Sequence, residues 1–422
     1  MLEQALKTQI MNQVDRQFDD QTKVLADLVK IPSTRFREAP AQDMMARLFK
    51  EDKLGVDRWQ IKIDDLKHLP GYSPHSQDYD DAWNVVGAWR PSNPKGRTLI
   101  LNGHIDVVSP EPRAQWNRDP FTAHTEGEWL YGRGAADMKC GLAAILGAVR
   151  GLRQIGLTPK APVHIQSVVE EECTGNGTLQ TLLAGYHADA AVIAEPFGAA
   201  ITTSQVGVLW FDVIVEGLPG HAAEAGNAIS AIEASLMTIG ALRGLEEEMN
   251  VEPPPPYDEF AHPIALNVGQ IHAGDWNSTV PGECVTGFRI ATYPGRSLDE
   301  LRRRVEQVIT DATVEHAHAF PRPPRVRYRG FAAEGYELGP DHLLVDSVSS
   351  AYARHMGARP ALVATTGTTD ARVLGLVGGI PSVCFGPYAE GAHGLGERVY
   401  LPSVVQTAQV MGLFIKGWWG VS

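Results

Sequence analysis

The stretch Thr98-Leu-Ile-Leu-Asn-Gly-His-Ile-Asp106 begins with an apolar run and ends in a histidine and an aspartate. An apolar run this short is typical of a strand that is buried on both faces of a sheet. Such a strand would present His104 and Asp106 beyond its carboxyl end. The segment Gly141 to Leu152 has the small residues of a helix that packs closely on a sheet. Strands that alternate with helices indicate an α/β fold with a mostly parallel sheet and helices on both faces.

Two more apolar runs repeat this plan. Val163 to Val169 leads into Glu170-Glu-Glu172, and Ala190 to Ala194 leads into Glu195. In open α/β sheets, ligands bind beyond the carboxyl ends of the strands. The recurrence of polar residues at these strand ends therefore predicts one shared site rather than three unrelated loops.

The order of expected strands and helices changes near residue 207. Six segments follow in the order strand, helix, strand, strand, helix, strand, which is the ferredoxin-like order. They are Gly207 to Gly217, Ala225 to Glu248, Ile264 to Ile271, Cys284 to Thr292, Leu298 to Ala312 and Arg325 to Tyr328. We expect residues 207–331 to form an α+β lid or dimerisation domain, inserted into a catalytic domain of residues 1–206 and 332–422. A single helix is expected over residues 4–30.

The composition excludes several partners. The 422 residues include 50 acidic and 37 basic ones, which gives a formal net charge of -13 and disfavours nucleic acid or an anionic membrane surface. No apolar run approaches the roughly 20 residues of a membrane span, and the first residues lack the apolar core of a signal peptide. The four cysteines lie far apart with no CxxC pair. We expect a cytoplasmic protein with reduced thiols.

The triplet Glu170-Glu-Glu172 places three like charges side by side. Either a bound cation or a solvated loop would relieve the repulsion between them. The apolar strand before the triplet and the tight glycine turn Thr174 to Thr178 favour the cation.

Asp137 and His393 extend this pattern. Asp137 lies at a glycine-marked turn before a helix, so a helix N-cap is its alternative role. His393 lies in Gly391-Ala-His-Gly-Leu-Gly-Glu397, after another apolar strand. Two histidines with several carboxylates suit zinc, cobalt or manganese better than calcium or magnesium.

At this point the sequence resembles a known family. It is similar to the acetylornithine deacetylase, succinyl-diaminopimelate desuccinylase and aminoacylase family of co-catalytic zinc hydrolases, which also contains carboxypeptidases and dipeptidases. The resemblance runs from Ile31-Pro-Ser33 to His393. The stretches that carry it are Leu101-Asn-Gly-His-Ile-Asp106, Trp116-Asn-Arg-Asp-Pro-Phe121, Tyr131 to Gly141, Glu170 to Thr178, Ala194-Glu-Pro196 and Gly391 to Glu397.

The resemblance implies two divalent metal ions per chain, with zinc as the best fit and cobalt or manganese as alternatives. His104 and Glu195 match the ligands of one ion. Glu172 and His393 match the ligands of the other. Asp137 matches the carboxylate that bridges the two.

The resemblance also implies a mechanism. Asp106 matches the residue that orients the first histidine ligand, and Glu171 matches the general base. The position of the base is counted back from Gly177-Thr178, so a slip of one residue would exchange it with its neighbour. In such sites a metal-bridged hydroxide attacks the amide carbonyl while the base moves the proton.

Three residues of the insert match substrate contacts of the family. His221, in Gly220-His-Ala222, matches a histidine placed over the scissile carbonyl, and in several relatives it comes across a dimer interface. Asn277 and Arg289 match residues that hold the carboxylate of the substrate. Gly287 stands where an acid often precedes the arginine, and Cys140 replaces a glycine of the Asp-Met-Lys-Gly-Gly segment. A structural arginine paired with a carboxylate of the insert is the alternative for Arg289.

The function expected from these residues is removal of the acyl group from an N-acyl amino acid or a related carboxylate-bearing amide. A metallo-carboxypeptidase or dipeptidase is the alternative on the same site. A non-catalytic metal-binding or amino-acid-binding protein is a remote alternative. The partner would be a small N-acyl amino acid or dipeptide-like substrate, and the exposed edge strand of the insert is compatible with a homodimer.

Overall fold

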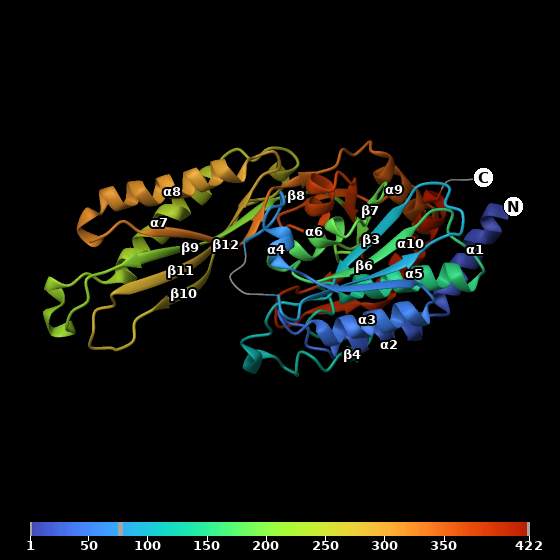
Figure 1. Ribbon diagram of the computed structural model, residues 1–422, viewed down its shortest axis with the longest axis horizontal. Helices are drawn as coiled ribbons and strands as arrows, with labels where there is room; N and C mark the ends of the chain where they lie inside the picture. The colour runs from blue at the N-terminus through green and yellow to red at the C-terminus, as the bar shows by residue number, and fades with distance from the viewer. Residues whose placement is uncertain (1, 75–78, 420–422) are drawn as a thin grey trace.

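A nine-stranded mixed sheet forms the main layer of the computed structural model, which describes residues 2–74 and 79–419 (Figure 1). Its order is β1-β2-β6-β3-β7-β15-β8-β13, with β14 paired to β8. The bounds are β1 Gly55–Gln60, β2 Trp83–Trp89, β3 Leu99–His104, β6 Val163–Val168, β7 Ala191–Ile193, β8 Ile201–Gln205, β13 Tyr336–Glu337, β14 Leu362–Thr365 and β15 Ser382–Cys384.

The centre of this sheet is parallel, as the sequence predicts. β6, β3, β7 and β15 run parallel to one another. Every residue of β3 and β6 is buried, as expected of strands that are covered on both faces of a sheet. The edges differ from the centre, because β1, β2, β13 and β8 make antiparallel pairs.

Helices cover both faces of the sheet. α3 (Ala39–Glu51) and α5 (Lys139–Gln154) lie on one face, where added methyl groups on Gly87 and Gly103 would meet their side chains. α6 (Asn176–Leu183) lies on the other face and receives hydrogen bonds from Asn84 and Asn102. The remaining helices of this part are α4 Ile63–Leu66, α9 Leu343–Met356 and α10 Leu401–Trp418. The fold class expected from the sequence is confirmed.

The single N-terminal helix expected over residues 4–30 is wrong. The chain forms α1 (Leu2–Asp15) and α2 (Phe18–Val29), separated by a turn at residues 16 and 17. Gln17 is buried in this turn and donates a hydrogen bond to Gln154 at the end of α5. Both helices pack against α5, so tertiary contact overrides the continuous helical pattern. No helix in the described residues is both long enough and apolar enough to cross a membrane.

The insert is a four-stranded antiparallel sheet in the order β10-β11-β9-β12, which is the ferredoxin-like order. Its strands are β9 Gly207–Glu216, β10 Leu266–Ala273, β11 Glu283–Thr292 and β12 Arg325–Ala333. Its helices, α7 Ala231–Met249 and α8 Leu298–Glu315, lie on one side of this sheet (Figure 1). Phe211, Val213, Phe288 and Ile290 belong to a separate core under them. The domain boundaries at 207 and 331 stay a prediction.

Two element bounds of the insert were predicted wrongly. The helix expected from Ala225 begins only at Ala231, because residues 222–227 form a 3-10 turn and Ser230 caps the helix by accepting from Glu233. The last strand, expected to end at Tyr328, continues to Ala333 after an irregularity in its pairing with β9.

A third, small sheet was not predicted, because its strands are only two or three residues long. It has the order β16-β17-β5-β4, with bounds β4 His124–Glu126, β5 Trp129–Tyr131, β16 Ala389–Glu390 and β17 Arg398–Tyr400. Arg398 pairs with Tyr131 in this sheet. The pairing places the loop after β5 beside the loop between β16 and β17, and these two loops carry Asp137 and His393.

Candidate metal centre

The residues expected as metal ligands come from five places in the chain. His104 ends β3, the acidic triplet follows β6, and Glu195 follows β7. Asp137 precedes α5, and His393 lies in the loop between β16 and β17. The parallel sheet brings the first three segments to one edge, and the small sheet adds the other two.

Asp137 lies between the two histidines. Its Oδ1 is 3.0 Å from Nε2 of His104, and its Oδ2 is 3.4 Å from Nε2 of His393. Each histidine also has a glutamate beside it. Oε2 of Glu172 lies 3.0 Å from His393, and Oε1 of Glu195 lies 3.8 Å from His104. The carboxylate of Asp137 therefore faces the ring nitrogens of two histidines, and each histidine has a glutamate beside it.

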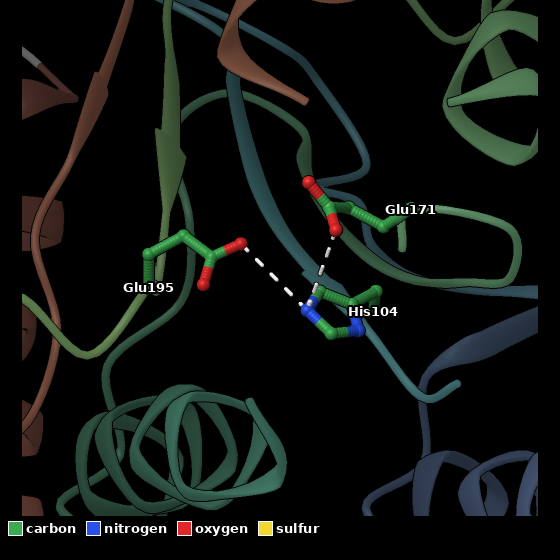
Figure 2. Close-up of side chains that lie close together, drawn as sticks. All are labelled: His104, Glu171 and Glu195. Atoms are coloured by element: carbon green, nitrogen blue, oxygen red, sulfur yellow. Dashed lines mark ion pairs between the residues drawn. The ribbon is translucent and has the colours of Figure 1, made fainter. Parts of the chain in front are cut away.

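Glu171 and Glu195 approach the same ring nitrogen of His104 from different strand ends (Figure 2). Oε2 of Glu171 is 3.8 Å from the Nε2 of His104. The side chain is buried, and burial raises the pKa of Glu171 well above its usual range. A buried carboxylate with raised proton affinity suits a group that accepts a proton and gives it back.

Burial and mutual repulsion also raise the pKa values of the neighbouring acids. Burial is the main cause for Glu195 and Glu172, followed by the charge of Asp137. The carboxylates of Asp137 and then Glu172, which accept hydrogen bonds from the His393 ring, raise the pKa of His393 to about 11. The cluster therefore favours a positive charge at its centre.

The donor set fits metal ions. In the described residues, ligand atoms of His104, Glu171 and Glu195 lie within 4.8 Å of one another, and so do those of His104, Asp137 and Glu172. The buried Oε1 of Glu172 accepts no hydrogen bond, although a buried polar atom normally has a partner. Two imidazoles among carboxylates are the ligands that zinc, cobalt or manganese prefers.

Asp106 contacts the site in a way that the sequence does not predict. Nδ1 of His104 lies 2.9 Å from the backbone carbonyl of Asp106, which accepts a hydrogen bond from the Nδ1–H group and leaves Nε2 facing Asp137. The carboxylate Oδ1 of Asp106 is farther away, at 3.5 Å. Its Oδ2 accepts a hydrogen bond from the backbone of Glu172. Asp106 thus contacts both the histidine strand and the acidic triplet.

Glu397 holds the two loops of the small sheet together. Its Oε1 accepts hydrogen bonds from the backbone N–H groups of Gly134, Ala136 and Asp137, at 2.7, 3.0 and 3.1 Å. Its other oxygen pairs with Arg133, which also donates to the backbone carbonyl of His393. Sequence reasoning missed this role, although Glu397 lies in the quoted His393 segment.

Glu170 anchors the acidic triplet. It has a positive φ of 67° and accepts two hydrogen bonds from Arg35, at 2.6 and 2.8 Å. Tyr79 and Thr174 donate to the same carboxylate. Arg35 and Tyr79 were missed, because nothing in their local sequence marks a partner 91 or 135 residues away.

Asp370 and Arg372 are buried and lie close enough to Glu171 to interact with its charge. Asp370 accepts a hydrogen bond from Thr178, and burial raises the pKa of Asp370 to about 6. Arg372 donates to the carbonyl of Thr174 at the end of the triplet's turn. Sequence reasoning missed both residues, since a lone aspartate after a threonine-rich run is a common loop pattern.

The three expected substrate residues of the lid lie apart from this cluster. His221 and Asn277 are exposed on neighbouring loops. These loops are joined by an isolated antiparallel β-bridge between His221 and Thr279. Arg289 lies on β11, and its guanidinium donates to the carbonyls of Ala265 and Thr366. In the described part of the chain, no hydrogen bond or ion pair joins any of the three to the candidate metal ligands.

The fold and the site define a metal-dependent hydrolase that acts on amide bonds. The sequence model of the family described as "Peptidase family M20/M25/M40" matches residues 100–417, so the chain belongs to this family. The resemblance drawn from the sequence is confirmed.

Relatives are similar over most of the chain. The N-formyl-4-amino-5-aminomethyl-2-methylpyrimidine deformylase of Bacillus subtilis is 26% identical, over 89% of this chain and 88% of its own length. The succinyl-diaminopimelate desuccinylase of Methylobacillus flagellatus is 30% identical, over 86% of this chain and 94% of its own. The solved structure of the di-peptidase Dug1p from Saccharomyces cerevisiae shares the fold, with a TM-score of 0.81, 15% identity and 98% of each chain covered.

Proposed function

We propose that the protein is a dinuclear metal-dependent amidohydrolase that removes the acyl group from an N-acyl amino acid or a related carboxylate-bearing amide. The position of Asp137 carries this proposal. One oxygen faces each histidine, at 3.0 and 3.4 Å, as a carboxylate shared by two cations would. His104 with Glu195 would hold one ion, and His393 with Glu172 the other.

Zinc suits this mixture of imidazole and carboxylate best, with cobalt and manganese as alternatives. When bound, such a pair of ions supplies Lewis acidity and lowers the pKa of water. Glu171 is buried beside His104 and has no assigned ligand role, so it is free to move a proton. It takes a proton from the attacking water and returns it to the nitrogen of the leaving amine. Asp106 fixes the tautomer and orientation of His104.

Arg289 is the proposed grip for the carboxylate of the substrate, with Asn277 beside it. The guanidinium donates to two carbonyls, and no carboxylate in the described residues forms an ion pair with it. This disfavours the alternative of a structural ion pair within the insert. A planar guanidinium matches both oxygens of a carboxylate.

A homodimer is part of the proposal, with His221 acting on the developing oxyanion of the neighbouring subunit. β9 leaves the catalytic part at Gly207 and ends at Glu216, a span of roughly 30 Å at about 3.3 Å per residue. His221 follows this far end. A second chain, or a large closure of the lid, is therefore needed to bring it to a metal centre.

The names of relatives favour a deacylase, since a deformylase and a desuccinylase match along most of the chain. A dipeptidase or carboxypeptidase is the second candidate, supported by the fold shared with a di-peptidase. We place the protein in the cytoplasm, where its four free, buried cysteines would stay reduced.

A substrate panel tests the proposal. The metal-loaded protein is incubated with N-formyl, N-acetyl and N-succinyl amino acids and with dipeptides, and the released amine is measured. We expect hydrolysis of N-acyl amino acids that is abolished by chelation and restored by zinc or cobalt. Faster cleavage of dipeptides would favour the peptidase. No amine release from any amide, at confirmed metal occupancy, would contradict the proposal.

A further inference from the structure

One face of the lid sheet is free of the two lid helices. α7 and α8 pack against the face that carries Phe211 and Phe288. Side chains alternate between the faces of a strand, so Asp212 of β9 and Arg289 of β11 lie on the other face. We call this other face the open lid face.

Two arginines of β12 meet on the open lid face. Arg327 donates to Oδ2 of Asp212 from Nε at 3.0 Å and from Nη2 at 2.7 Å. Arg329 donates to the same oxygen from Nε at 2.6 Å and reaches Gln270 with its Nη2. All three bonds to Asp212 thus use a single carboxylate oxygen.

This cluster carries more positive than negative charge. The Asp212 side chain is 2% exposed, whereas those of Arg327 and Arg329 are 57% and 41% exposed. One carboxylate cannot neutralise two guanidinium groups, and each guanidinium has five donors. Most of these donors are open to a ligand. The excess of positive charge stands out in a chain of net charge -13.

Gly287 leaves space beside the cluster. It pairs with Asp212 across the sheet, and a methyl group added to it would lie 3.4 Å from Oδ1 of Asp212 and from Cβ of Gln270. The family resemblance places an acid near this position, but here a side chain is absent. A ligand can therefore approach the guanidinium groups without displacing a side chain at position 287.

The cluster lies one step along the sheet from the proposed carboxylate grip. Arg289 pairs with Trp210, and Asp212 is two residues further along β9 on the same face. Such diagonal neighbours lie about 7–8 Å apart. Both positions adjoin the catalytic part of the chain, because Arg289 donates to Thr366 and the residue after Arg329 donates to Pro74.

We propose that Arg327 and Arg329 form a second carboxylate subsite, so that the preferred substrate carries one carboxylate at Arg289 and another at this pair. This inference rests on the proposed function and names its substrate class as dicarboxylic N-acyl amino acids. The second carboxylate belongs either to the acyl group or to the side chain of the amino acid. Guanidinium pairs held in place by a buried acid suit it, because their geometry is set before the ligand arrives.

The test compares matched substrates that differ only in charge. N-succinyl-L-alanine is compared with its succinamoyl analogue, and N-acetyl-L-glutamate with N-acetyl-L-glutamine. In each pair a carboxylate is replaced by a carboxamide of the same shape. We expect kcat/KM to favour the carboxylate by about tenfold or more in one pair, mainly through KM. The pair that shows the preference identifies which half of the substrate carries the group.

Arg329→Gln should abolish that preference for the carboxylate substrate. Arg329→Lys should retain part of it, since an ammonium keeps the charge but cannot form the two parallel hydrogen bonds of a guanidinium. The single substitution leaves Arg327 on Asp212, so the lid stays intact. Arg325→Gln is the matched control. Arg325 lies on β12 like Arg327 and Arg329, but it donates to Glu216, as Arg322 does, and not to Asp212. The preference of this control variant should match that of the wild type.

Two results would overturn the subsite. One is equal kcat/KM within both substrate pairs, while amides are still hydrolysed. The other is an equal loss of preference in Arg325→Gln and Arg329→Gln, which would indicate diffuse attraction by the whole face. Failure of the proposed function is distinguishable, because then no amide in either pair would be cleaved at all.

Discussion

Most of the chemistry of the site is decided by single residues whose types and order are visible in the sequence. Arg289 is the residue of this kind that sets the expected charge of the substrate. Its guanidinium is half-buried at the junction with the catalytic part and makes no ion pair with a described carboxylate. A cation that is partly withdrawn from water and has no carboxylate partner is costly unless a ligand supplies one.

We predict that the wild type hydrolyses an N-acyl amino acid and fails on its methyl ester, and that Arg289→Lys loses most of this discrimination. The lost bidentate contact should cost about 1.5 to 3 kcal/mol in kcat/KM for the acid. The measurement is kcat/KM for acid and ester in both proteins. Equal rates on the two substrates in the wild type would rule out a carboxylate grip at Arg289.

The candidate ligands could be predicted from the sequence because each follows a recognisable strand or glycine turn. His104 ends a buried strand, Glu171, Glu172 and Glu195 follow buried strands, and the structure brings these four residues together. The residues that hold them could not be predicted. Arg35 binds Glu170 across 135 residues, and Arg133 binds Glu397 across 264. Long-range side-chain pairs leave no local pattern in one sequence.

At the scale of elements, long periodic segments were predictable and short ones were not. The lid's order of strands and helices follows from alternating and helical patterns, which are strong over ten or more residues. The small sheet was missed because strands such as Arg398–Tyr400 carry too few residues for any pattern. The break between α1 and α2 was missed because contacts with α5, and not local sequence, create it.

That small sheet leads to a prediction about Glu397, which ties the loop of Asp137 to the loop of His393. Glu397→Gln replaces an oxygen that pairs with Arg133 by an amide donor. We predict that the affinity for the metal ion proposed to bind at His393 falls roughly 10- to 100-fold, the usual effect of losing a supporting contact. Metal titration of the apoprotein by calorimetry measures it.

Arg150→Gln is the control for Glu397→Gln. It breaks a partly buried pair with Asp52, at 2.8 Å, away from the metal ligands. It should lower thermal stability without changing metal affinity. The positioning role of Glu397 fails if its variant binds both ions like the wild type, or if the control loses metal equally.

At the scale of the whole molecule, the lid extends away from the catalytic part (Figure 1). His221 follows the end of β9 that is farther from the catalytic part. A site completed by a second chain predicts complementation. Mixed dimers of a His221→Ala chain and a Glu171→Gln chain should contain one site with both residues intact. We expect activity to rise after mixing toward about one quarter of the wild type, on statistical grounds for random exchange with one intact site in half of the dimers.

The mixing experiment needs two controls. Subunit exchange is confirmed with differently tagged chains, and each variant alone should show greatly reduced turnover with normal metal content. If exchange is complete and no activity returns, each chain supplies its own histidine, and closure of its own lid would have to bring His221 to the site.

The central claim is that Glu171 moves protons beside a metal pair held by other residues. The alternative is also close at hand, because Glu171 lies with His104 and Glu195 in one group of potential ligands. The deciding measurement is metal content per chain together with turnover in Glu171→Gln. We predict two metal ions per chain, as in the wild type, and turnover lower by two to four decades, roughly the range for lost acid–base catalysis. Loss of one ion from the variant, or turnover like that of the wild type, would contradict it.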